Sequence, residues 1–77
     1  MASKDYTLTS EWQQITNGTQ DVQLQVLSGT IWLRDSATKP SVNAKGHIVS
    51  TMMWIGITAP QQMWARSQGG QTTIIVT

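Results

Sequence analysis

The sequence predicts an all-β protein: a small single-domain β-sandwich or barrel of about six short antiparallel strands, with residues 1–77 forming one domain. Three observations favour this class. Apolar and polar residues alternate at every second position over several stretches, as they do in half-buried strands. Turn-forming residues separate these stretches at short, regular intervals. No stretch combines helical length with helical periodicity.

The first strand is expected at residues 5–9, before the strong turn signal Asn17-Gly18. The clearest alternation covers residues 22–26, and a second alternating run covers residues 30–34. Ser28-Gly29 between these runs has the composition of a two-residue hairpin turn. The pairs expected on the apolar face of this hairpin are Val26–Ile31 and Leu24–Leu33.

The C-terminal part predicts a second hairpin, with strands at residues 63–67 and 72–76 around the turn Gly69-Gly70. Both faces of this hairpin carry apolar residues, so we expect both to be covered, one by the core and the other by a second surface. The expected pairs are Ala65–Ile74 and Met63–Val76 on one face, and Trp64–Ile75 and Arg66–Thr73 on the other.

Residues 35–45 are rich in turn formers and predict a loop of about ten residues. A middle strand is expected near residues 47–51. The apolar run 52–57 either continues this strand or starts another, and Thr58-Ala59-Pro60 ends it.

Composition excludes several classes of function. Charged residues make up 12% of the chain, against about 25% in a typical soluble domain. The five basic residues are scattered, whereas nucleic-acid binding requires a dense basic face. No window is apolar enough for a membrane span, and the N-terminus lacks the apolar stretch of a secretory signal. Threonine, serine and glutamine supply a neutral surface that can be buried against protein without desolvating ions.

A domain of 77 residues buries only about 60% of the surface that its unfolded chain exposes, so small domains usually need a staple. The sequence has no cysteine and one histidine, which excludes disulfides and a metal site of several histidines within one chain. Association with another subunit is the staple that remains.

The chain offers no convincing catalytic group. His47 is the single imidazole and is interpreted either as a general base or, with more weight, as an ordinary strand residue. Asp21 and Asp35 would meet at the open end of the first hairpin, where acids usually serve turns. We therefore expect no enzyme, no catalytic residue, no cofactor and no metal site.

The four tryptophans are the unusual feature. Each belongs to the core, to a subunit interface or to an exposed surface that stacks on a glycan. The core interpretation has most weight for Trp12 and Trp54. The residues expected at subunit or partner contacts are Trp32, Trp64, Ile75, Arg34 and Arg66.

The order of features resembles the small β-structured virion proteins of tailed bacteriophages. The resemblance rests on the opening segment Tyr6–Ile15, the central Lys39-Pro40 and Lys45-Gly46-His47, and above all Met63-Trp64-Ala65-Arg66-Ser67 before a glycine turn. It implies a structural protein of the head decoration or tail/fibre type, often a trimer, that is made in the host cytoplasm and incorporated into the virion.

The leading hypothesis is therefore a bacteriophage virion protein that forms a homo-oligomer, a trimer by this resemblance, and docks on other capsid or tail subunits. The alternative is a receptor- or carbohydrate-binding module at the phage tail, which would bind a host surface glycan through exposed tryptophan. A cytoplasmic β domain with a host-directed partner is the third possibility.

Overall fold

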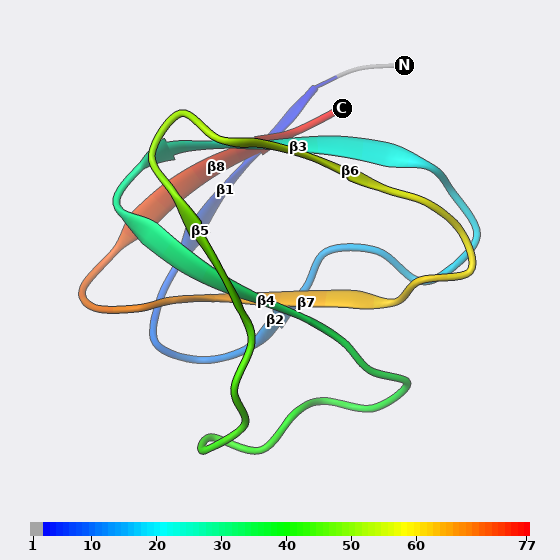
Figure 1. Cartoon of the computed structure of the whole chain (residues 1–77), viewed down its shortest axis with the longest axis horizontal. Coiled ribbons are helices and arrows are strands. Elements are labelled where there is room, and N and C mark those ends of the chain that lie inside the picture. The colour runs from blue at the N-terminus through cyan, green and yellow to red at the C-terminus, as the bar shows by residue number, and fades with distance from the viewer. Residues whose placement is uncertain (1–2) are drawn as a thin grey trace.

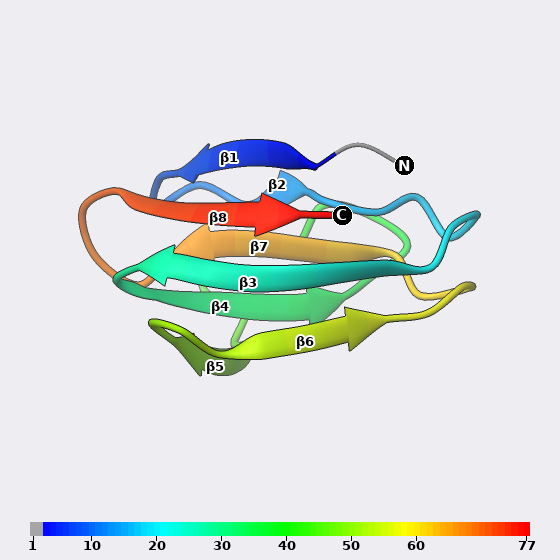
Figure 2. The same ribbon diagram turned by 90° about the horizontal axis from the view of Figure 1, so that it is seen from above.

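The computed structural model describes residues 3–77. Its strands form two four-stranded antiparallel sheets packed face to face (Figures 1 and 2). In spatial order, sheet A contains β1 (Lys4–Leu8), β8 (Thr72–Val76), β3 (Val22–Ser28) and β6 (Trp54–Ile57). Sheet B contains β2 (Gln13–Gln14), β7 (Met63–Ser67), β4 (Thr30–Asp35) and β5 (His47–Ser50).

The all-β class and the antiparallel pairing are confirmed, but the expected number of strands is wrong. Residues 3–77 form eight strands rather than about six. Strand β2 escaped prediction because it has only two residues, both exposed glutamines without any alternation. The run 52–57 starts a new strand, β6, because the chain turns at Met52, whose φ is 75°.

The strand orders β1-β8-β3-β6 and β2-β7-β4-β5 are those of an eight-stranded jelly roll, an arrangement of two Greek keys in two sheets. Within residues 3–77, β4–β5 is the one connection that joins neighbouring strands of the same sheet. Every other connection passes between the sheets. The sheets do not close into a barrel, because β6 at the edge of sheet A and β5 at the edge of sheet B are not paired with each other.

Both hairpins predicted from the sequence are wrong. β3 and β4 lie in different sheets, and so do β7 and β8. β3 contains an irregularity between Val26 and Ser28, and Gly29 follows with a φ of 77°. Strands commonly change sheets at bulges and bends of this kind. The expected pairs, such as Val26 with Ile31, therefore face each other from two sheets and are not neighbours in one.

The predicted inward faces are nevertheless correct. Alternate residues of each strand point into the space between the sheets, so the side chains that would have shared one hairpin face meet in the core. The buried core cluster consists of Leu8, Leu24, Val26, Ile31, Leu33, Val49, Ile57, Met63, Ala65, Ile74 and Val76.

Candidate interaction surfaces

The loop between β4 and β5 covers the outer face of sheet B. This segment, residues 36–46, is called the flap below. It matches the predicted loop 35–45 closely, and Figure 1 shows it running beneath β4 and β7, on the side away from sheet A. The outward side chains of β4 and β7 alternate with core residues, so they project into the space between the sheet and the flap.

Four side chains of the body fasten the flap by donating hydrogen bonds to its backbone carbonyls. Such bonds satisfy loop carbonyls that sheet pairing leaves open. The bonds are Trp64 Nε1 to Ser36 O (3.0 Å), Trp12 Nε1 to Ser41 O (2.9 Å), Arg66 Nη1 to Val42 O (2.7 Å) and Arg34 Nη1 to Lys45 O (2.8 Å).

Arg66 is the centre of this layer. Its guanidinium carbon lies 4.9 Å from the centre of the Trp32 ring and 5.5 Å from that of the Trp12 ring. A cation over an aromatic face contributes about 0.5–1 kcal/mol at exposed sites and more where it is desolvated. Trp32 Nε1 and Arg66 Nε are buried without a hydrogen-bond partner, so the layer is held by stacking as well as by hydrogen bonds.

An ion pair adds a further link to the flap, because Lys39 Nζ donates to the Glu11 carboxylate. The hydrogen bond from Lys39 and, after it, the positive charge of Lys39 lower the pKa of Glu11 below its ordinary value of 4.5. Both side chains are more than half exposed, so the pair contributes modestly to stability.

The five residues expected at one interface do not share one surface. Trp32, Trp64, Arg34 and Arg66 belong to sheet B and interact with the flap or with one another. Ile75 lies on the outer face of sheet A, on the opposite side of the molecule. The chain changes sheets at Gly69-Gly70, so the outward residues of β7 and β8 point in opposite directions. The predicted hairpin had placed these residues on one face.

The expectation that Trp12 is a buried core residue is confirmed, and the same expectation for Trp54 is wrong. Trp12 is 4% exposed, and it packs at the flap beside Arg66 rather than in the main core cluster. Trp54 is 63% exposed, so the core interpretation of this residue is wrong. The sequence did not indicate this exposure, because the apolar run 52–57 has no alternation that would distinguish an outward face from an inward one.

The outer face of sheet A, called the neutral face below, is almost free of charge. Pairing aligns Asp5, Ile75, Gln25 and Trp54 in one row across its four strands. Thr7 and Thr73 form a second row, and Gln23 lies opposite Gly56 in a third. Asp5, on the edge strand β1, is the one charged side chain among these described outward positions.

Sequence reasoning identified Ile75 but missed the rest of the neutral face. The sequence does carry a signal for this face, because the polar members of the alternation in β3 and β8 are glutamine and threonine. The incorrect hairpins obscured it by assigning β3 and β8 to different pairs, whereas the structure makes them neighbours.

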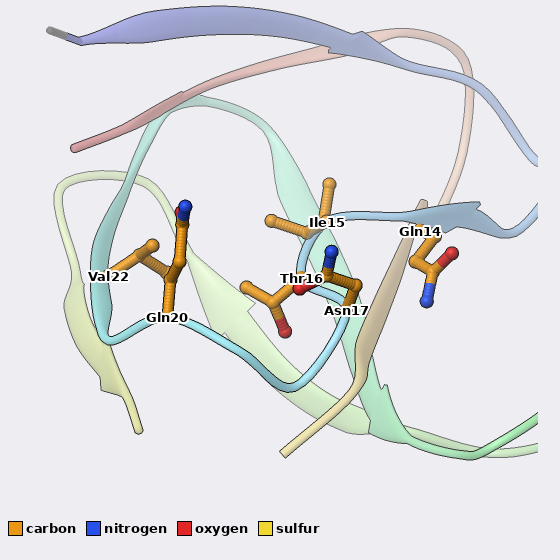
Figure 3. Close-up of a pocket in the computed structure, with 6 residues that line it drawn as sticks. All are labelled: Gln14, Ile15, Thr16, Asn17, Gln20 and Val22. Carbon is orange, nitrogen blue, oxygen red and sulfur yellow. The ribbon is translucent and has the colours of Figure 1, made fainter. Parts of the chain in front are cut away.

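One hollow of the molecule is lined by uncharged residues alone. It has a volume of about 230 Å³ and is lined by Gln14, Ile15, Thr16, Asn17, Gln20 and Val22. Figure 3 shows Gln20 and Val22 on one side of it and Ile15, Thr16 and Asn17 on the other. The Thr16 hydroxyl donates to Gln61 O at 3.0 Å and accepts from Met63 N at 3.0 Å. This hydroxyl therefore holds two segments together and is not free for a ligand.

The titratable residues considered above serve local structure. Asp21 Oδ1 accepts the backbone N–H of Ala59 at 2.8 Å, and Asp35 Oδ1 accepts that of Gln62 at 2.9 Å. Both carboxylates thus anchor the segment before β7. His47 is exposed at the start of β5. Within the part of the chain that the structure describes, no group of three or more His, Cys, Asp or Glu could hold a metal ion.

Comparisons with protein-family models, with curated proteins and with solved structures find no match for this chain. Among residues 3–77, no helix has the length and apolar character needed to cross a membrane.

Proposed function

We propose that this chain is a structural subunit of a tailed-bacteriophage virion, of the head decoration or tail/fibre type, and that it docks on other virion subunits through the neutral face. The observation that carries the proposal is the composition of this face. Four adjacent strands present glutamine, threonine, isoleucine and the exposed Trp54, with a single charge at one edge.

Desolvation favours this face as a docking surface. Burying an unpaired charge costs far more than burying an amide or hydroxyl that finds a hydrogen-bond partner. The rows through Gln25 and Thr73 offer donors and acceptors around the half-buried Ile75, so a partner surface can cover them without stranding an ion. Protein interfaces depleted in charge at their centre have this composition.

The fold is compatible with the proposal. Jelly rolls occur in viral capsid domains and also in lectins, so the topology by itself does not choose between assembly and ligand binding. The resemblance of the sequence to small phage virion proteins favours assembly. In this proposal Trp32, Trp64, Arg34 and Arg66 lie outside the docking surface, because they belong to the layer that holds the flap on the opposite side of the molecule.

The test is incorporation into particles. An antibody against the purified protein should label tailed particles purified by density gradient from a lysate of the phage or lysogen that carries the gene. Gln23→Lys places a charge on the neutral face and should reduce incorporation. Gln68→Lys, at an exposed loop position outside this face, should not. Protein found only in the particle-free fraction would refute the proposal.

A second candidate is a receptor- or carbohydrate-binding module at the tail. It is favoured by Trp54, which is 63% exposed and lies opposite Gln25 in the sheet, and by the open space above Gly56. An aromatic ring beside an amide is suited to a sugar. Glycan binding should quench tryptophan fluorescence, and Trp54→Leu should abolish the quenching. An unchanged signal over a broad glycan panel argues against this candidate.

A further inference from the structure

The exposed large apolar residues of this protein concentrate where the chain passes from β5 to β6. Ile48, Met52, Met53 and Trp54 are 63%, 70%, 48% and 63% exposed. These four residues are called the edge patch below. The sequence has no Asp, Glu, Lys or Arg between residues 48 and 65, so the patch itself is uncharged.

Three residues of the edge patch are adjacent along the chain, and Ile48 reaches them across an opening. Met52, Met53 and Trp54 are consecutive, and the backbone of the first two pairs with Val26 at the end of β3 (Met52 N to Val26 O, 2.8 Å; Val26 N to Met53 O, 3.2 Å). Ile48 and Met53 line one opening of about 410 Å³ between the unpaired edges of β5 and β6. Two residues of the patch therefore border the gap that keeps the two sheets from closing into a barrel, and Asp35 and His47 line the same opening.

The two edge strands of sheet A differ in how they are protected from pairing with another chain. Natural sheets protect edge strands from pairing with other chains by placing charged residues or proline on them. β1, at one end, carries Lys4 and Asp5. β6, at the other end, has the sequence Trp-Ile-Gly-Ile and carries neither kind of protection. An unprotected edge strand with exposed apolar side chains is typical of a protein interaction site.

Met52 adds an independent sign of function. Its φ of 75° is a left-handed conformation that suits glycine or asparagine and is unfavourable for a long side chain. The Met52 side chain is also 70% exposed, so contacts within the chain do not account for methionine at this position. Met52 thus has an unfavourable backbone conformation, and no contact within the subunit offsets its cost. Such a residue points to a contact outside the subunit.

We propose that the edge patch binds a second copy of this chain about a twofold axis, with β6 of each copy antiparallel to the other. The inference rests on the proposed function of this chain as an assembly protein. The edge patch meets the neutral face at Trp54, which belongs to both surfaces, and its other three residues lie outside the neutral face. Sheet A would then continue across the axis into the same sheet of the second copy.

Charge and area both favour a second copy as the occupant. A twofold contact sets a patch against itself, so any charge on it would meet the same charge, and this patch has none. Its four residues are 63%, 70%, 48% and 63% exposed, which amounts to about 500 Å² of largely apolar surface. A standard interface buries about 800 Å² per partner, of which roughly 60% is apolar. The edge patch thus supplies about the apolar share that a stable dimer needs.

The trimer implied by the resemblance fits this surface less well. A closed trimer requires two different complementary surfaces on each subunit. The edge of sheet A that could receive β6 in such a ring is β1, which carries Lys4 and Asp5 and is the protected edge of the sheet.

The test is sedimentation equilibrium of the purified full chain over a range of concentrations. The wild type should be a dimer at micromolar concentration. Trp54→Lys, which charges the edge strand, should raise the dissociation constant about tenfold or more. Val42→Lys is the matched control, because Val42 is 76% exposed on the flap and should leave the dimer unchanged. Circular dichroism verifies that both variants are folded.

Met52→Asn gives a second readout that a merely structural role would not produce. Asparagine fits the left-handed turn better than methionine, so the variant should unfold at a higher temperature when measured at low, monomeric concentration, and yet it should dimerise more weakly than the wild type. A wild type that stays monomeric at millimolar concentration overturns the proposal. So does a trimer, or an equal effect of Trp54→Lys and Val42→Lys. Incorporation into virions without dimerisation would overturn the inference while leaving the proposed function intact.

Discussion

The passage from β3 to β4 depends on Gly29, and Gly29→Ala is the substitution that tests it most directly. Gly29 has a φ of 77°, which lies in the left-handed region. A β-carbon at this position would lie 2.3 Å from Thr72 Cγ2, well inside van der Waals contact. Thr72 belongs to β8 and is 2% exposed, so its methyl group has no open space into which to move.

Two costs add at this position. An alanine held in the left-handed region costs about 1 kcal/mol relative to glycine. Forcing a methyl group into a packed site costs about 1–3 kcal/mol more. We therefore expect Gly29→Ala to lower the free energy of unfolding by about 3 kcal/mol, which is a large part of the stability of a small domain.

Urea unfolding followed by tryptophan fluorescence measures this loss. The slope for a domain of this size is about 1 kcal/mol per molar urea, so the midpoint should fall by about 2–3 M. All variants must be compared at one protein concentration, because self-association would make the midpoint depend on it.

Two other glycines separate the two costs. Gly70 has a φ of 67° and open space where a β-carbon would lie, so Gly70→Ala should show the backbone cost alone, about 1 kcal/mol. Gly69 has neither a positive φ nor a close neighbour, so Gly69→Ala should be nearly neutral. In the Gly29→Ala background, Thr72→Ser removes the clashing methyl group and should recover the packing cost. Equal losses for Gly29→Ala and Gly70→Ala would refute the reasoning, because they would place Gly29 at the free tip of a hairpin.

Three further predictions concern the flap. Trp64→Phe removes the indole N–H that binds Ser36 O, so it should cost about 1 kcal/mol and speed amide hydrogen exchange in residues 36–46; unchanged exchange there would contradict the fastening role. Arg66→Lys loses the planar stack on Trp32 and should lower the thermal midpoint by several degrees, whereas an unchanged midpoint would show that the stack contributes little. The folded state lowers the pKa of Glu11 below 4.5. The stabilisation from this group is therefore present above that pH and is lost as the pH falls through the lowered pKa. Glu11→Gln should reduce this loss of stability at acid pH in a series of thermal melts, and identical pH profiles for the variant and the wild type would count against the prediction.

The inward faces of the strands were more predictable from the sequence than the neighbours of each strand. Leu24 and Val26 on β3 and Ile31 and Leu33 on β4 are all buried, as their alternation indicates. The hairpin between them is absent, because a short linker with glycine serves equally well for a tight turn and for a change of sheet. β3 pairs instead with β6 and β8, which are distant in sequence.

The candidate surfaces divide in the same way. The scarcity of charge that the neutral face depends on is a property of composition and can be read from the chain. That Ile75 lies far from Trp32 and Trp64 could not be read, because residues of one sequence face are separated once their strands enter different sheets. The exposure of Trp54 likewise depends on β6 being an edge strand, which no local pattern specifies.

The sequence by itself therefore determined the all-β class, the side chains that leave water and the neutral character of the surface, because alternation and composition are local properties of a strand. Only the tertiary structure decided which strands are neighbours, which edge is left open and which tryptophans the flap covers. These features depend on contacts between residues far apart in the chain, and a pattern with a period of two identifies the face of a residue without identifying its partner.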